Sequence, residues 1–157
     1  MRQETRDKTP GKVGGGAAGH AKLEAFQYAD DLAVELFAVT RRLPPDLRWL
    51  SSQLLRAATS VPANIAEGYA RSSRREFLQF LSISRASLAE VEYFIHFMHR
   101  TGLITPEQHA RLSEQRISAA QRLHGFIKYV RSQVNAADKK KSAIYESTEE
   151  YVTDAES

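Results

Sequence analysis

Apolar side chains recur at three- and four-residue spacings through most of this chain, and almost no stretch alternates apolar and polar residues as a strand would. The first helical segment runs from about 22 to 43, where Pro44 and Pro45 end it. The second begins near Asp46 and keeps its apolar phase across Pro62, which predicts one kinked helix. The periodicity therefore predicts an all-α fold.

Two further helices are marked by their capping residues. Ser73 and Glu76 form a capping-box pattern at the start of the third helix, and Gly102 marks its end. The fourth helix opens at Thr105, which precedes a proline at the first helical position. Four helices joined by short connections predict an antiparallel up-down-up-down four-helix bundle.

Both ends of the chain differ in composition from the middle. Residues 1–21 are rich in glycine and other small residues, and residues 136–157 form a polar, acidic stretch with few large apolar side chains. Such compositions cannot bury enough apolar surface to form a core. We therefore expect disordered tails at 1–21 and 136–157, on either side of one bundle domain at 22–135.

Several classes of function are disfavoured by what the sequence lacks. With no cysteine it has no disulfide, thiolate metal site or cysteine nucleophile. No stretch approaches about 18 uninterrupted apolar residues, and the N-terminus lacks the apolar core of a secretion signal. These features predict a cytoplasmic protein with no membrane partner.

The sequence also lacks the motifs of helical-bundle enzymes. No Glu or Asp is followed by His three residues later, which is the spacing of di-iron bundles. Glu92, His96 and His99 share one helix face, but this face is polar, so surface histidines are favoured over a metal site. We therefore expect a non-enzymatic protein without a metal or other cofactor.

The third helix carries more apolar surface than one bundle face requires. Ile83, Phe94 and Phe97 extend this surface around the helix. Large exposed apolar patches usually mark association, so we expect a homo-oligomer with this helix in the interface. Glu90 falls within the same arc and needs a partner, for which Arg56 on the second helix is the candidate.

The second helix has a polar stripe opposite its apolar face. The stripe contains Arg56, Ser60, Asn64 and Glu67, and Gly68 would allow another helix to approach closely. One interpretation is an ordinary solvated face. The other is a hydrogen-bond network between subunits, and the sequence alone leaves both open.

The segment RAATSVPANIAEGYARSSRREFLQFLSISRASLAE resembles the signature of the four-helix-bundle proteins encoded in bacterial 23S ribosomal RNA intervening sequences. The resemblance covers roughly 26–131 and is most specific in the quoted segment. Leu55, Ala86 and Phe26 depart from the family pattern, which usually has arginine, glycine and tryptophan there. The resemblance implies a cytoplasmic bundle that forms a ring-like homopentamer. It also implies similarity to retroelement accessory proteins, which bind nucleic acid and a reverse transcriptase.

Arginines cluster near two of the predicted turns, which lie at opposite ends of an up-down bundle. A ring would repeat each cluster around its axis and so form a basic rim for the phosphates of RNA or DNA. We interpret the chain as an oligomeric, RNA-associated accessory protein; the alternative is a scaffold that docks another protein on the third helix. The candidate nucleic-acid-binding residues are Arg71, Arg74 and Arg75 at one turn, and Arg41, Arg42 and Arg48 at the other.

Overall fold

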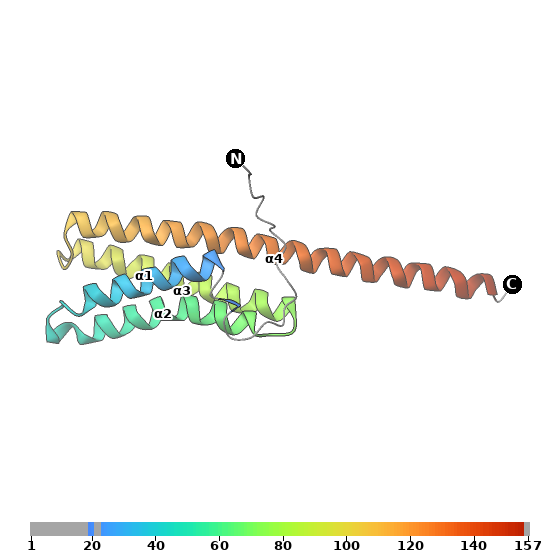
Figure 1. The fold of residues 1–157 in the computed structure, drawn as a ribbon, viewed down its shortest axis with the longest axis horizontal. Coiled ribbons are helices and arrows are strands. Elements are labelled where there is room, and N and C mark those ends of the chain that lie inside the picture. Colours follow the sequence, from blue (N-terminus) through green and yellow to red (C-terminus); the bar gives the residue numbers. More distant parts are fainter. Residues whose placement is uncertain (1–18, 21–22, 156–157) are drawn as a thin grey trace, which may run out of the picture.

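The computed structural model describes residues 19–20 and 23–155, with the backbone alone for 145–155. Four helices run antiparallel to their neighbours in an up-down-up-down bundle (Figure 1), as the sequence predicts. Each helix packs against two others, which closes a four-sided bundle. The helices are α1 (Glu24–Thr40), α2 (Arg48–Tyr69), α3 (Arg74–Arg100) and α4 (Pro106–Ala155), and the 3-10 turn η2 (Pro45–Leu47) precedes α2.

The capping signals fix the helix boundaries near the predicted positions. The backbone N–H of Glu76 donates to Ser73 Oγ at the start of α3, and Gly102 has a φ of +71° just beyond its end. At the start of α4 the box is reciprocal. The N–H of Thr105 donates to Gln108 Oε1 at 2.8 Å, and the N–H of Gln108 donates to Thr105 Oγ1 at 3.1 Å.

Helix α2 continues through Pro62, which is buried. Side-chain hydroxyls bind two carbonyl oxygens in the part of α2 that precedes this proline. Thr59 Oγ1 donates to the carbonyl of Leu55 at 2.7 Å, and Ser84 Oγ on α3 donates to the carbonyl of Val61 at 2.9 Å. The prediction of one helix across the proline is therefore confirmed.

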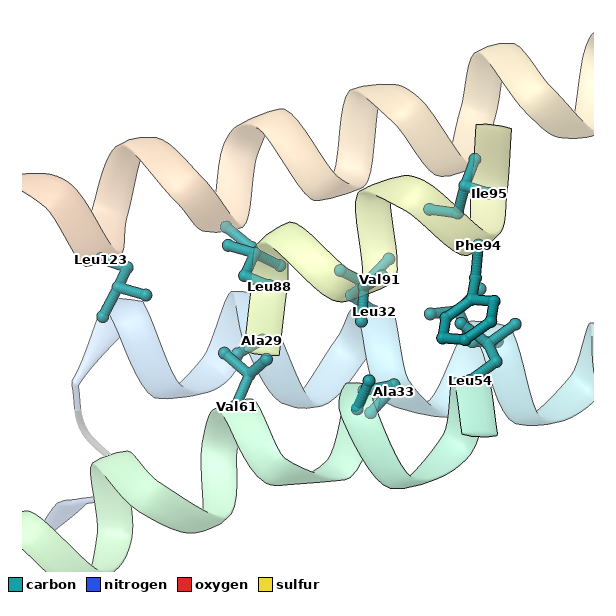
Figure 2. Packing of buried hydrophobic residues seen from close by; sticks show 14 of the residues in the cluster. Ala29, Leu32, Ala33, Leu54, Val61, Leu88, Val91, Phe94, Ile95 and Leu123 are labelled. Carbon is teal, nitrogen blue, oxygen red and sulfur yellow. The ribbon is translucent and has the colours of Figure 1, made fainter. Parts of the chain in front are cut away.

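The core consists of the apolar faces of all four helices (Figure 2). Leu36, Leu54, Leu81 and Leu123, one from each helix, are almost completely buried. Burying each such side chain stabilises the fold by about 1.5–3 kcal/mol before conformational entropy is subtracted. Phe94 also belongs to this cluster, as Figure 2 shows.

Helix α4 continues to Ala155, so the structure differs from the disordered tail predicted for 136–157. Its last buried side chain among the described residues is Val134, and the side chains of 135–144 are exposed. Residues 136–155 contain alanine, lysine and glutamate and no glycine or proline, which favours a helix. A low content of apolar residues prevents burial but does not prevent helix formation. Helix α4 therefore projects beyond the bundle (Figure 1).

The predicted N-terminal tail falls largely outside the described residues. Of that segment, Gly19 and His20 are described, and the ring of His20 packs edge-on against Phe26 with 4.9 Å between ring centroids. The same ring lies 6.4 Å from Tyr69. This part of the segment therefore contacts the bundle. None of the described helices is long and apolar enough to cross a membrane.

Candidate functional site

The predicted partnership between Arg56 and Glu90 joins α2 to α3 within the chain. Arg56 Nη2 donates to Glu90 Oε1 at 2.7 Å and to Gln53 Oε1 at 3.2 Å. The Glu90 side chain is 36% exposed, more than the sequence predicts, because the pair lies on the outer edge of the two helices. The predicted ion pair is confirmed, and within a single chain it stays partly exposed to solvent.

The middle of the polar stripe also binds α3. The hydroxyls of Ser60 and Ser87 are 2.9 Å apart, and Asn64 Nδ2 donates to both the carbonyl and the Oγ of Ser60. Ser84 is completely buried and donates to the carbonyl of Val61. The stripe is therefore not a fully solvated face: Arg56 and Ser60 bind α3, and Asn64 binds Ser60 on its own helix.

Gly68 allows α2 and α3 to approach closely at the other end of the stripe. A Cβ at this position would lie 2.6 Å from Phe77 Cδ2 and 2.7 Å from Phe80 Cβ, so any side chain would require the helices to shift. Next to it, Arg71 donates to Glu67 at 2.8 Å and places its guanidinium over the Phe80 ring.

We call this contact the α2–α3 seam. Sequence analysis predicted its α2 residues and the Arg56–Glu90 pair, but not that Ser60 meets Ser87 on α3 of the same chain. It missed Ser84, although a small polar residue three positions after Leu81 and four before Leu88, both core leucines, is a recognisable signal. The seam consists of Arg56, Ser60, Asn64, Gly68, Ser84, Ser87 and Glu90.

The candidate apolar interface residues on α3 differ in their exposure to solvent. Ile83 is 48% exposed and Phe97 is half-buried. Phe94 is buried, because it lies three residues after Val91 and four before Met98 on the core side of the helix. Phe94 is therefore corrected from a candidate surface residue to a core residue.

Two exposed aromatic side chains flank Phe97, and sequence interpretation does not select the first of them, Trp49. Trp49 at the start of α2 and Tyr93 on α3 are each more than half exposed. Their ring centroids lie 6.2 Å and 6.3 Å from that of Phe97. We call these three residues the aromatic cluster. Trp49 could have been noticed because it lies outside the apolar phase of α2.

The candidate nucleic-acid-binding arginines lie at opposite ends of the bundle, near the turns on either side of α2 (Figure 1). At the α2–α3 end, Arg71 and Arg75 are exposed and Arg74 is half-buried. Arg75 binds Asp138 on α4 at 2.5 Å, and Arg71 binds Glu67, so two of these three charges have acidic partners. The arginines at the α1–α2 end are all exposed; they are Arg41, Arg42 and Arg48.

The histidines near the end of α3 do not form a metal site. His96 and His99 are exposed, and Glu92 forms an ion pair with Arg116 at 3.0 Å. Among the residues that the structure describes, no group of three or more His, Cys, Asp or Glu side chains is arranged to hold a metal ion.

The quoted signature thus forms the α2–α3 seam and the turn beside it. A family model described as 23S rRNA-intervening sequence protein matches residues 21–125, which include α1, α2, α3 and the first part of α4. The chain belongs to this family. The match ends within α4, so the projecting part of that helix lies beyond it.

A solved structure supports the same fold for this 23S rRNA-intervening sequence protein. It is a crystal structure of a protein with unknown function from the S23 ribosomal protein family of Bacteroides thetaiotaomicron. The two chains are 28% identical with a TM-score of 0.62, and the match covers 66% of this chain and 95% of the other. No curated protein matches the chain.

Proposed function

We propose that this 23S rRNA-intervening sequence protein is a non-enzymatic, oligomeric bundle that associates with RNA and binds its phosphate backbone. The observation that carries the proposal is the group Arg71, Arg74 and Arg75, which lies within a few residues at one end of the bundle. Arginine presents several donors to phosphate oxygens, and such contacts are largely independent of base sequence. DNA offers the same phosphates, so RNA and DNA are compared in the test below.

Self-association would strengthen this binding. The aromatic cluster lies beside the Arg56–Glu90 pair, and together they offer a second copy an apolar contact next to a charged one. A ring, of which a homopentamer is the form that the family resemblance implies, would repeat the arginine group around its axis. Affinity for a polyanion would then fall steeply with rising salt, because each phosphate contact releases counterions.

Light scattering and a salt-titrated binding assay test the proposal together. We expect a mass several times that of one chain, and binding to single-stranded RNA that weakens as salt rises. Replacing Arg71, Arg74 and Arg75 by alanine should remove most of this binding. The matched variant replaces Arg41, Arg42 and Arg48 and removes the same charge from the opposite end. A parent that binds neither RNA nor DNA at low salt contradicts the proposal.

A second candidate function is a scaffold that docks a different protein, such as a reverse transcriptase, on the aromatic cluster. The exposure of Trp49 and Tyr93 favours this candidate, because aromatic side chains are enriched in protein interfaces. If the first candidate is right, Trp49→Ala with Tyr93→Ala should lower the mass of the assembly and its affinity for RNA. If the cluster docks a different protein, both quantities should stay unchanged. A monomeric parent that binds no nucleic acid would favour the scaffold.

A further inference from the structure

Two adjoining hollows lie between α3 and α4, on the side of α3 away from the α2–α3 seam. They have volumes of about 240 Å³ and 140 Å³, and Glu92 and Arg116 line both. Arg85 and His124 line the larger hollow, and His96 and His109 line the smaller one. We call this surface the α3–α4 groove.

Three of the five histidines of the chain line this groove, and a fourth, His99, stacks on one of them; we call these four the groove histidines. His96 and His99 come from α3, and His109 and His124 come from α4. The rings of His99 and His109 are stacked with 3.9 Å between centroids and an angle of 8°. The planes of stacked rings are parallel, so their nitrogen lone pairs do not converge on one point, which disfavours a metal ion shared by this pair.

Arginine and lysine add permanent charge to the groove. Arg85 and Arg116 line it, and Glu92 is the acid that binds Arg116. Beyond His124, Lys128 and Arg131 follow at four and seven residues, so they share its face of α4, and both are exposed. Basic side chains therefore continue from the groove along α4 towards Asp138, which forms an ion pair with Arg75 at the α2–α3 end.

The opposite flank of α4 has a different character. Of two hollows between α4 and α1, one is lined by Asp31 and Glu114 and the other by Glu24 and Arg122, each together with uncharged residues. On that flank Arg111 binds Glu35, and Arg122 binds the hydroxyl of Tyr28. The described histidines of α4 thus face α3, whereas the arginines on the α1 flank lie among acidic side chains.

We propose that the α3–α4 groove binds the phosphate backbone of RNA, with an affinity that rises as its histidines take up protons. This inference rests on the proposed function and assigns the path that the RNA follows: along the groove towards the arginines of the α2–α3 end. Arg85 and Arg116 hold the backbone at neutral pH. Protonated histidines add positive charge where phosphates pass.

The surroundings of His109 make it harder to protonate than an isolated histidine. Partial burial, followed by the nearby His99 and then His96, lowers the pKa of His109 from its ordinary value of 6.5. The charged groups that face it from the two helices are these histidines, Glu92 and Arg116. His109 therefore takes up its proton at a lower pH than an isolated histidine, and a phosphate beside it would favour the charged form.

Fluorescence anisotropy with the full chain and a labelled mixed-sequence RNA single strand of about 20 nucleotides tests the inference at constant ionic strength. The parent should bind about tenfold more tightly at about pH 6 than at about pH 8, because each contact between a protonated histidine and a phosphate contributes a few-fold at most. Replacing the four groove histidines by glutamine should abolish this difference.

The charge of the groove is tested separately. Arg85→Gln with Arg116→Gln should weaken binding several-fold at both pH values. The matched control is Arg111→Gln with Arg122→Gln, which removes the same charge from the opposite flank of α4 and should leave affinity close to that of the parent. Equal losses from the two double variants, or a histidine-free groove that keeps its full pH response, would overturn the inference.

The two proposals fail differently. If the parent binds RNA and loses affinity only when Arg71, Arg74 and Arg75 are replaced, the proposed function stands and the groove inference fails. If the parent binds no RNA, both fail. A second measurement avoids variants that do not fold: in an NMR titration of the parent with RNA, the groove histidine ring protons should shift while those of His20 do not. Unshifted groove histidines count against the inference.

Discussion

The two flanks of α3 contrast in how they use their polar residues. On the α2 flank, side chains bind one another, as in Arg56 with Glu90 and Ser60 with Ser87, and Gly68 lets the helices approach closely. On the α4 flank the helices leave hollows lined by Arg85 and His124, among others. The family signature is dense in polar residues chiefly because it forms a packed seam. The groove histidines lie outside the quoted signature.

The largest expected effect on stability comes from placing a side chain in the tightly packed seam. Gly68→Ala should lower the free energy of unfolding by about 1–3 kcal/mol, because its Cβ would overlap Phe77 and Phe80. Urea unfolding measures the change. The control is Gly125→Ala on α4, where nothing lies within 4 Å of a new Cβ, so it should stabilise the protein by up to about 1 kcal/mol. Equal effects at the two glycines would contradict the close packing of the seam.

Removing one buried hydrogen bond of the seam should have a smaller effect. Ser84→Ala loses the bond to the Val61 carbonyl and should cost about 1 kcal/mol of unfolding free energy. Ser82→Ala, an exposed change on the same helix, should be neutral or slightly stabilising. If both variants unfold at the same urea concentration, the hydroxyl of Ser84 contributes nothing to the seam.

The ion pair at the outer edge of the seam should contribute less again. A double-mutant cycle of Arg56→Ala and Glu90→Ala should give a coupling of about 0.2–1 kcal/mol, because both side chains are more than a third exposed. The cycle is measured by urea unfolding at low and high protein concentration. A coupling that grows with concentration would indicate that self-association buries the pair, whereas a constant value argues against this.

The smallest expected effect is a change in how the free energy of unfolding depends on pH, and it concerns the α3–α4 groove. The pKa of His109 is lowered in the folded protein, so the unfolded chain binds more protons as the pH falls below 6.5, and stability should decline there. The stabilising contribution is fully present above that value. His109→Gln should therefore show a shallower loss of unfolding free energy between about pH 7 and about pH 5 than the parent. Parallel curves for the two proteins would count against the titration of this residue.

Much of the fold could be predicted from the sequence because its signals are local. Capping boxes, the prolines before α2 and Gly102 fix helix boundaries through the backbone of a few neighbouring residues. The projecting part of α4 differs from the predicted tail, because low apolar content prevents burial without preventing helix formation. Helix propensity and burial are separate properties, and residues 136–155 combine the first without the second.

The candidate site was predicted less completely. A helical wheel places Arg56, Ser60 and Asn64 on one face but does not say which helix that face meets. The structure gives this face to α3 of the same chain. It also assigns Phe94 to the core and exposes Trp49, because the width of each buried arc depends on how closely the neighbouring helices pack.

The sequence by itself determined the number of helices, their order, their caps and the identity of the family signature, since each of these depends on residues that are close together along the chain. Only the tertiary structure decided that the signature forms a seam within one bundle, and that histidines from α3 and α4 share a groove. These are contacts between residues far apart in sequence, and they depend on which helices become neighbours and how closely they approach.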